Sequence, residues 1–435
     1  MSSQTAKKAP SYKKSDALLA RALELIPGGS QTFSKGHTQF PAGAAPLFLT
    51  KGKGCRVWDA DGNEYIDYAL GLGAIILGYG NRAVDVAMKK QIDDGPAFSL
   101  PTALEIELSE MLRERIPCAE MARFGKNGSD ATSGAIRVAR AATGREHVAF
   151  CGYHGWQDWH IGATTRSLGV PEAVKALTHP FEYNKLDSLS AIFDRFPGKV
   201  AAVILEPTGM EAPAKGFLEG IKKLCKAKGA VLIFDEVVTG FRFARGGAQE
   251  LYGVTPDLAC FGKAMANGMP LSTVVGSREL MKVFDDVFFS FTAGGECVSL
   301  AAAKATMLEL DRLDAYPHLW KLGERLRDGL NALSKRHGLE KRLRAVGPGP
   351  HHIVEFKDER GETDLILKSL FQQEAAARGV LFLLHNICAA HRIQDIDETL
   401  AAYDEALAVI AKAAASGEPK RFLKGRAVSP IFRKP

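Results

Sequence analysis

VAAVIL, residues Val200–Leu205, is the first of three short apolar stretches that decide the fold; AVLIF (Ala230–Phe234) and the weaker LACF (Leu258–Phe261) follow it. The first two are rich in β-branched residues, and residues 218–228 between them have a helical pattern. Short apolar strands that alternate with helices indicate a parallel sheet that is covered on both faces. We therefore predict an α/β fold with a mostly parallel central sheet.

Polar residues follow each of these predicted strands. They are Glu206 after the first, Asp235 and Glu236 after the second, and Lys263 after the third. In parallel sheets the chemistry lies beyond the carboxyl ends of the strands, so these side chains are expected to meet.

Lys263 and Asp235 suggest a specific chemistry. A lysine that is desolvated at a strand end has a lowered pKa and becomes a nucleophile. A carboxylate against a pyridine nitrogen keeps that nitrogen protonated, as pyridoxal phosphate chemistry requires. The alternatives are that Lys263 snorkels at the surface and that Asp235 only caps a helix.

Residues 126–130 (KNGSD) precede a predicted helix over residues 131–142. Gly128 and Ser129 at a helix N-terminus fit an anion site, although Ser129 or Asp130 also fits a plain helix cap. The glycine-rich stretch 290–295 (SFTAGG) offers a second hydroxyl, that of Thr292, to a phosphate.

The stretch YHGW over residues 153–156 follows a strand-like segment, His147–Phe150. An aromatic ring of Tyr153 or Trp156 is suited to stack on a planar cofactor, and ordinary core packing is the alternative. We expect no metal site, because the histidine and carboxylate pairs lack the spacing of helical ligands.

The charge of the chain lies mainly at its ends. The chain of 435 residues has 56 basic and 50 acidic residues, but without residues 1–14 and 417–435 it has 46 and 49. A basic face for nucleic acid is therefore not expected, and no stretch is apolar enough for a membrane span. Seven scattered cysteines and no secretion signal predict reduced thiols and a cytoplasmic location.

We expect two folded domains and several further elements. The expected helices cover Asp16–Leu25, Leu104–Arg115, about 318–336 and Glu398–Ala415; a strand is expected at His352–Phe356 and a hairpin at Cys55–Asp67 with a type I′ turn at Asp61-Gly62. The expected divisions are a disordered basic tail (1–15), an N-terminal segment of the small domain (16–75), a large cofactor-binding domain (76–315), the C-terminal small domain (316–416) and a basic tail (417–435).

Taken in order, the motifs resemble those of class III, fold type I, pyridoxal-phosphate aminotransferases, and most of all the glutamate-1-semialdehyde aminomutase branch. The resemblance extends over about residues 16–415. The motifs are Gly128-Ser129-Asp130, Tyr153-His154-Gly155, Glu206-Pro207, Asp235-Glu236-Val237 with Thr239-Gly240-Phe241-Arg242, Gly262-Lys263 and Thr292-Ala293-Gly294-Gly295.

The resemblance implies pyridoxal 5'-phosphate as cofactor and a small α+β domain built from both chain ends. It implies that Lys263 forms the internal aldimine and moves the proton, and that Asp235 contacts the pyridine nitrogen. It further implies that Gly128, Ser129 and, from a neighbouring subunit, Thr292 bind the phosphate. Tyr153 and Val237 are implied to cover the two ring faces and Glu206 to lie at the phenolic side, and His154 is a further implied cofactor contact. A site shared across subunits implies a homodimer.

The substrate side departs from the aminomutase branch. Thr32 and Lys35 stand where that branch has a serine and an arginine, Leu72 replaces a tryptophan, and Gly-Gly-Asn-Pro becomes Gly294–Cys297. Lysine cannot reproduce the bidentate fork of arginine. The stretch Leu381–His391 is also several residues shorter than its counterpart in that branch.

We therefore expect an aminotransferase that moves an amino group from an amine or amino acid to a carbonyl acceptor other than glutamate semialdehyde. Candidate substrate contacts are Lys35, Trp156, Glu296, His385 and Asn386. An intramolecular aminomutase or a racemase on the same scaffold is the alternative. A non-catalytic binding protein is a further alternative, but it would be expected to lack Lys263 or Asp235.

Overall fold

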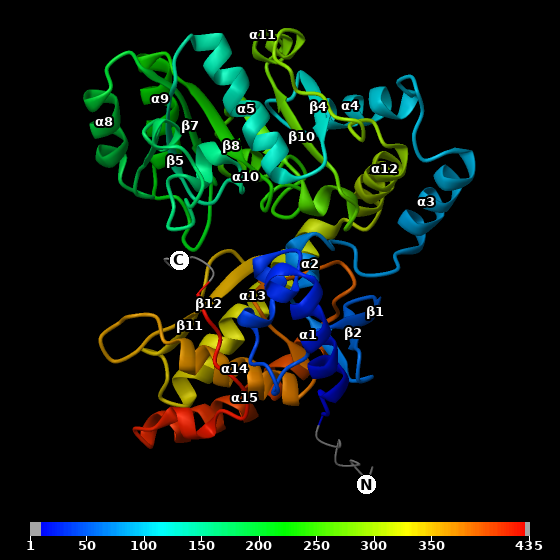
Figure 1. Cartoon of the computed structure of the whole chain (residues 1–435), viewed down its shortest axis with the longest axis vertical. Helices are drawn as coiled ribbons and strands as arrows, with labels where there is room; N and C mark the ends of the chain where they lie inside the picture. Colours follow the sequence, from blue (N-terminus) through cyan, green and yellow to red (C-terminus); the bar gives the residue numbers. More distant parts are fainter. Residues whose placement is uncertain (1–9, 431–435) are drawn as a thin grey trace. The chain divides into compact units, whose positions relative to one another are not determined.

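The computed structural model describes residues 10–430, which form two compact units (Figure 1). The small unit contains the chain up to Leu70, Gly78–Gly80 and the chain from Lys321 onward, and the large unit contains Gly71–Leu77 and Asn81–Trp320. The chain thus passes between units near residues 70 and 320, and not at 75 and 315. Residues 71–77 join the large unit because the Asn267 side chain accepts hydrogen bonds from the amides of Ile76 and Leu77.

The large unit is built on a seven-stranded sheet in the order β4-β10-β9-β8-β7-β5-β6. The pairs from β9 to β6 are parallel, and β10 runs antiparallel to both of its neighbours. The predicted α/β class with a mostly parallel sheet is confirmed. The strands are β4 (Met121–Gly125), β5 (His147–Cys151), β6 (Thr178–Pro180), β7 (Val200–Leu205), β8 (Val231–Asp235), β9 (Leu258–Phe261) and β10 (Ser272–Gly276).

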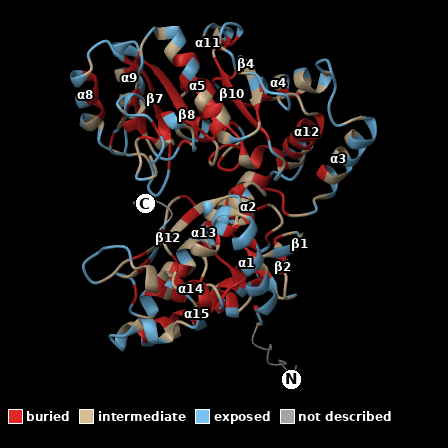
Figure 2. Cartoon of the chain, in the orientation of Figure 1, coloured by how far each residue is buried: buried red, intermediate tan, exposed pale blue. Residues whose placement is uncertain are grey.

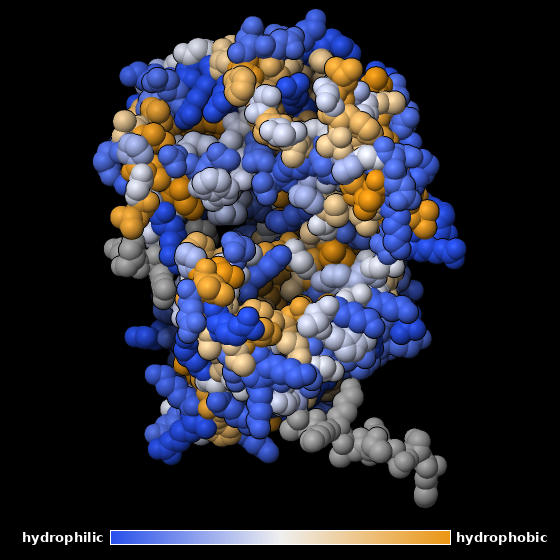
Figure 3. Space-filling model, turned by 45° about the vertical axis from the view of Figure 1, so that its right-hand side comes forward, coloured by the Kyte–Doolittle hydropathy of each residue, from blue (hydrophilic) through white to orange (hydrophobic). Residues whose placement is uncertain are grey.

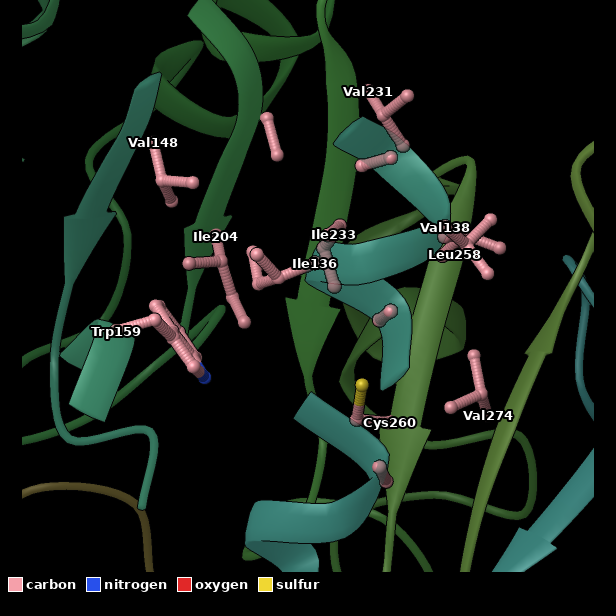
Figure 4. Close-up of a cluster of buried hydrophobic side chains, with 14 of the residues drawn as sticks. Ile136, Val138, Val148, Trp159, Ile204, Val231, Ile233, Leu258, Cys260 and Val274 are labelled. Atoms are coloured by element: carbon pink, nitrogen blue, oxygen red, sulfur yellow. The ribbon is translucent and has the colours of Figure 1, made fainter. Parts of the chain in front are cut away.

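Strands β7, β8 and β9 are buried along their whole length, which explains why they lack the alternation of a half-exposed strand (Figure 2). Helix α5 (Gly128–Thr143) packs its alanine-rich face across them. In Figure 4, Ile136 of this helix lies beside Ile233 of β8, and Val138 beside Leu258 of β9. The small side chains of α5 let the helix approach the sheet closely.

Further helices of the large unit lie around the sheet, some of them packed on other helices. They are α3 (Arg82–Asp94), α4 (Ala103–Arg115), α6 (Asp158–Ile161), α7 (Glu172–Lys175), α8 (Leu186–Arg195), α9 (Phe217–Lys228), α10 (Ala248–Tyr252), α11 (Arg278–Met281) and α12 (Cys297–Arg312). Short 3₁₀ helices lie at Lys263–Ala266 and Lys282–Asp285.

The small unit combines helices with two small sheets, as predicted for an α+β domain from both chain ends. One sheet has the order β1-β2-β3-β13 and the other β11-β12-β14. The strands are β1 (Leu49–Lys53), β2 (Arg56–Asp59), β3 (Glu64–Asp67), β11 (Leu343–Val346), β12 (His351–Phe356), β13 (Val380–Leu381) and β14 (His385–Asn386). The helices are α1 (Lys13–Leu25), α14 (Leu365–Ala377) and α15 (Ile393–Ala415), with 3₁₀ helices at Pro27–Gly29, Phe33–Lys35, His37–Gln39 and Pro419–Phe422. Helices α2 (Leu70–Gly73) and α13 (Ala315–Arg336) cross the unit boundaries.

Parts of the two expected tails are folded onto the small unit. Helix α1 begins at Lys13, and the buried Ser15 donates its amide to Asp61. Near the other end, the amide of the buried Val428 donates to Ser369 Oγ at 2.9 Å. The expected disorder of residues 1–15 is therefore wrong for residues 10–15. The C-terminal basic stretch, for which the sequence left packing open, packs on the small unit over residues 417–430, and the remaining residues of both ends lie outside the described part of the chain.

The predicted hairpin forms, but its turn is of another type. Strands β2 and β3 pair antiparallel, and Gly62 has a φ of 91° while Asp61 does not adopt a positive φ. A type I′ turn needs a positive φ at both central residues. The turn differs because Asp59 Oδ1 accepts hydrogen bonds from the amides of Asp61 and Asn63, which folds a longer four-residue connection.

Over residues 10–430, no helix is both long and apolar enough to cross a bilayer. The face of the molecule in Figure 3 carries mainly hydrophilic side chains, with hydrophobic ones scattered among them, as is usual for a folded chain. All seven cysteines lie in the described residues as free thiols.

Candidate active site

The carboxyl ends of three neighbouring strands carry the polar residues that the sequence singled out. Glu206 follows β7, Asp235 ends β8, and Lys263 follows β9 after one glycine. Asp235 stands opposite Cys260 in the β8–β9 pairing, so the acid and the lysine share one edge of the sheet. The structure thus brings these three groups together as expected.

The Asp235 carboxylate is almost fully buried, with 4% of the residue exposed. Its Oδ1 accepts the amide of Val237 at 3.0 Å, and its Oδ2 lies 2.8 Å from Nδ1 of His154. The first contact orders the turn after β8, which is close to the capping role that is the alternative for Asp235. The second contact ties the acid to a buried imidazole, which a capping role does not require.

His154 is held from all sides. Its Nε2 lies 3.2 Å from the carbonyl oxygen of Cys151, its amide donates to His160 Nε2, and its carbonyl accepts the Thr132 hydroxyl. Both ring nitrogens therefore face oxygen atoms, which fixes the orientation of the ring. Burial and the neighbouring His154 lower the pKa of His160 to about 3, so His160 is neutral and its Nε2 accepts.

Lys263 lies half-buried in a left-handed conformation, with a φ of 42°, at the start of a 3₁₀ helix. Desolvation lowers the pKa of its amine, against the opposing effect of the carboxylates of Glu206 and Asp235. Desolvation and the nearby Asp235 raise the pKa of Glu206. A more neutral amine beside a carboxyl group that holds its proton more readily is the arrangement expected for proton exchange.

The first turn of α5 (residues 128–130, the cradle) lies at the stretch where the sequence predicts an anion site. The amides of Gly128 and Ser129 have no acceptor within the helix, and Asn127 with Asp130 forms a capping box that leaves them at its mouth. A Cβ on Gly128 would lie 2.8 Å from Val237 Cγ1, and a Cβ on Gly155 would lie 2.5 Å from Ser129 Cβ. The backbone can approach this closely only where there is no side chain.

Ser272 is a site candidate that the sequence did not reveal. It starts β10 and is fully buried, and its hydroxyl has no hydrogen-bond partner among residues 10–430. It lies against Gly125, at the end of β4, and against Gly262, which directly precedes Lys263. Because β10 runs antiparallel to β9, its first residue reaches the edge where the parallel strands end. No apolar pattern or turn signal marked this strand in advance.

Two aromatic side chains near this edge are exposed. Tyr153 is 50% exposed, its amide donates to Glu206 Oε1 at 3.0 Å, and its ring makes an edge contact with His160. Trp156 is 66% exposed. Neither ring is part of the core, so the alternative of ordinary core packing does not hold for them.

Comparison with known proteins decides the family. The family model described as Aminotransferase class-III matches residues 39–394. The chain belongs to this family. It is a pyridoxal-phosphate-dependent aminotransferase with the fold of the fold type I enzymes.

The chain is similar to several proteins of known name or structure. The glutamate-1-semialdehyde 2,1-aminomutase of Persephonella marina is 37% identical over 82% of this chain and 90% of that protein. The 3-aminobutyryl-CoA aminotransferase of Cloacimonas acidaminovorans is 37% identical over 92% and 98%. A solved structure of the FumI protein of Sphingopyxis sp. MTA144, in its pyridoxal-phosphate internal aldimine form, matches with a TM-score of 0.87 and 32% identity over 94% and 100%.

The residues present fit this cofactor. The cradle of α5 offers amides to a phosphate, the buried Ser272 hydroxyl adds a donor beside it, and Val237 and Tyr153 offer an aliphatic and an aromatic surface. Asp235 and Lys263 would offer an acid to the ring nitrogen and an amine to the aldehyde. Within residues 10–430, no cluster of side chains is arranged to hold a metal ion.

Glu296 has a structural task, although it was expected at the substrate. It caps α12, accepting the amide of Val298 at 2.7 Å and the hydroxyl of Ser299 at 2.6 Å, and it pairs with Lys126 at 2.9 Å. Thr292 lies exposed in the preceding loop.

The other substrate candidates belong to the small unit. Lys35 is exposed on a 3₁₀ helix. His385 and Asn386 are fully buried: His385 Nε2 lies 2.7 Å from the Tyr403 hydroxyl, and the Asn386 amide donates to the carbonyl oxygens of Tyr68 and Ala69. These contacts give the two side chains a role in the core of the small unit and do not support a substrate contact.

Proposed function

We propose that the protein is a two-substrate aminotransferase that follows a ping-pong sequence, with Lys263 as its catalytic amine. The observation that carries this proposal is the meeting of Lys263, Asp235 and Glu206 at the ends of three adjacent strands, beside the anion cradle of α5. An amine or amino acid donates the amino group in the first half of the cycle, and a carbonyl compound accepts it in the second.

Lys263 acts as nucleophile and proton carrier in this proposal. When bound, pyridoxal phosphate supplies an electron sink that stabilises negative charge on the carbon next to the amino nitrogen. Lys263 takes the proton from that carbon and returns it at the next position. The lowered pKa of its amine increases the neutral fraction that accepts a proton near neutral pH.

Asp235 and His154 act as one unit. Asp235 holds the proton at the pyridine nitrogen, and the hydrogen bond from His154 Nδ1 fixes the carboxylate in place. Glu206 orders the opposite, phenolic side, where it already binds the amide of Tyr153. The amides of Gly128 and Ser129 bind the phosphate, and Tyr153 and Val237 enclose the two ring faces.

We further propose a homodimer in which Thr292 completes the phosphate site of the neighbouring subunit. Large apolar side chains of the large unit support an interface, since Phe98, Leu100, Ile106 and Phe288 are each more than half exposed. A cytoplasmic location remains a prediction from the free cysteines.

The substrate proposed is not glutamate semialdehyde. Lys35 and Thr32 replace the arginine and serine of the aminomutase branch, and Leu72 replaces its tryptophan. Similarity to a 3-aminobutyryl-CoA aminotransferase supports a two-substrate reaction. The second candidate is an intramolecular aminomutase, which the name of the Persephonella marina relative favours.

A donor screen tests the proposal. Purified holoenzyme is mixed with single amino donors, and the conversion of bound pyridoxal phosphate to pyridoxamine phosphate is followed by absorbance. We expect conversion by at least one donor and its reversal by a carbonyl acceptor. Efficient formation of 5-aminolevulinate from glutamate semialdehyde would instead establish the aminomutase, and racemisation without any acceptor would establish a racemase.

A further inference from the structure

The pair formed by Lys126 and Glu296 joins two segments that flank the cradle. Lys126 follows β4 and directly precedes the first turn of α5, and Glu296 follows the loop 290–295 and caps α12. Their Nζ and Oε2 atoms are 2.9 Å apart, and the side chains are only 14% and 22% exposed. Two segments that are 170 residues apart in the chain are thus held at one point.

Each partner is itself fixed. The amides of Lys126 and Asn127 donate to Asp130 Oδ2 at 3.1 and 2.7 Å, which ties residue 126 to the first turn of α5. The carboxylate of Glu296 accepts the amide of Val298 and the hydroxyl of Ser299. Because both residues are held by these hydrogen bonds, the ion pair between Lys126 and Glu296 fixes the start of α5 relative to the start of α12.

The neighbouring residue adds a second tie. The amide of Cys297 donates to the carbonyl oxygen of Pro96 at 2.9 Å. The family's usual proline at this place has no amide hydrogen and cannot make this bond. The unusual pair Glu296-Cys297 therefore anchors the loop 290–295 to residues 96 and 126 at once.

We propose that Glu296 is a positioning residue for the cofactor phosphate: through Lys126 it sets the first turn of α5 against the loop 290–295. This inference rests on the proposed function, since it takes Gly128 and Ser129 as the phosphate site. It assigns Glu296 to the cofactor and not to the substrate.

The substitution Glu296→Gln separates positioning from charge. Removing a negative charge near the bound phosphate would, by electrostatics alone, leave the affinity for pyridoxal phosphate unchanged or increase it. Loss of the positioning contact weakens binding instead. Glutamine at position 296 keeps an oxygen that can cap the Val298 amide. The second variant, Glu296→Asn, introduces the residue usual in the family. Asparagine still caps the helix, but its side chain is too short to reach Lys126.

The experiment is equilibrium dialysis of the full-length holoenzyme against a series of pyridoxal phosphate concentrations. We expect the dissociation constant to rise about tenfold in both variants, in line with the loss of one charge-assisted contact. The matched control is Glu107→Gln, which breaks the 2.7 Å pair between Glu107 and Lys304, also on α12. Its dissociation constant should equal that of the wild type.

Three results would overturn the inference: unchanged or tighter binding in both Glu296 variants, equal weakening in the Glu107→Gln control, or a KM for the amino donor that rises while cofactor binding stays constant. If Glu296→Gln does not fold, Glu296→Asn decides the question. Failure of the wild type to bind pyridoxal phosphate would defeat the proposed function as well, so the two failures are distinguishable.

Discussion

The two units bury polar groups in different ways. In the large unit, the side chains of Asp235, Glu206 and Lys263 gather at one edge of the sheet. Burial raises the pKa of Glu206 and lowers that of Lys263, so it favours the neutral form of each. In the core of the small unit, the Tyr68 hydroxyl lies 2.7 Å from Thr399 Oγ1, and His385 Nε2 lies 2.7 Å from the Tyr403 hydroxyl. Those side chains bind one another within the core.

The difference shows that burial of a titratable group does not by itself mark an active site. Burial lowers the pKa of His385 well below its usual range and raises that of Tyr68 well above its own. The Tyr68 hydroxyl and the His385 Nε2 nevertheless have hydrogen-bond partners inside the unit, whereas His385 Nδ1 is buried with none among residues 10–430. Position at strand ends, beside glycines that leave room for a ligand, separates the edge of the large unit from that core.

The largest expected effect is that of Lys263→Ala. Loss of the amine removes both the attachment point and the proton carrier, so activity should fall by about a thousandfold or more. The cofactor absorbance band that borohydride abolishes in the wild type should be absent. Lys304→Ala is the control and should keep the band. A wild-type band in the Lys263 variant would refute the assignment.

Asp235→Asn should reduce turnover by about a hundredfold. The amide can still accept the Val237 hydrogen bond but no longer holds a proton at the pyridine nitrogen. Stopped-flow measurement of the first half-reaction gives the rate, and the free energy of unfolding of the cofactor-free protein serves as the control. Near-wild-type turnover would reduce Asp235 to a turn residue.

Acid should destabilise the small unit. Burial lowers the pKa of His352 to about 4, whereas in the unfolded chain it is about 6.5. As pH falls from 6.5 towards 4, the unfolded chain binds a proton that the folded unit does not, so stability is lost; at pH 5 the loss is about 2 kcal/mol for this histidine. Urea unfolding at pH 7 and pH 5 measures it. His352→Gln should show a loss smaller by that amount, and an equal loss would contradict this account.

The smallest effect concerns the internal bonds of the small unit. Tyr403→Phe leaves the buried Nε2 of His385 without its partner, which should cost about 1–2 kcal/mol without changing the donor specificity. Thermal unfolding and the donor screen check the two parts. Tyr316→Phe is the matched control, because the Tyr316 hydroxyl is buried and has no hydrogen-bond partner within residues 10–430. This control should leave the free energy of unfolding nearly unchanged. A change in donor specificity in Tyr403→Phe would place this core at the substrate.

The sequence predicted elements wherever a local pattern is sufficient. Strands β7 and β9 have the predicted bounds, and β8 is displaced by one residue, because continuous apolar runs occur only in fully buried strands. The type I′ turn was wrong because the Asp59 carboxylate orders the loop through contacts that dihedral preferences do not include. Strand β10 and Ser272 were missed because an uncharged stretch with glycine has no distinctive period.

The sequence alone determined the family and the cofactor, because the motifs and their order can be read along the chain. It also predicted that the candidate site residues follow the ends of adjacent strands. Only the tertiary structure decided what several side chains do there. It placed His154 behind Asp235 at 2.8 Å, Glu296 against Lys126 at 2.9 Å, and His385 with Asn386 inside the small core. The physical reason is that hydrogen bonds between residues of different elements, such as His154 with Asp235 and Lys126 with Glu296, depend on how sheets and helices pack, which no local pattern encodes.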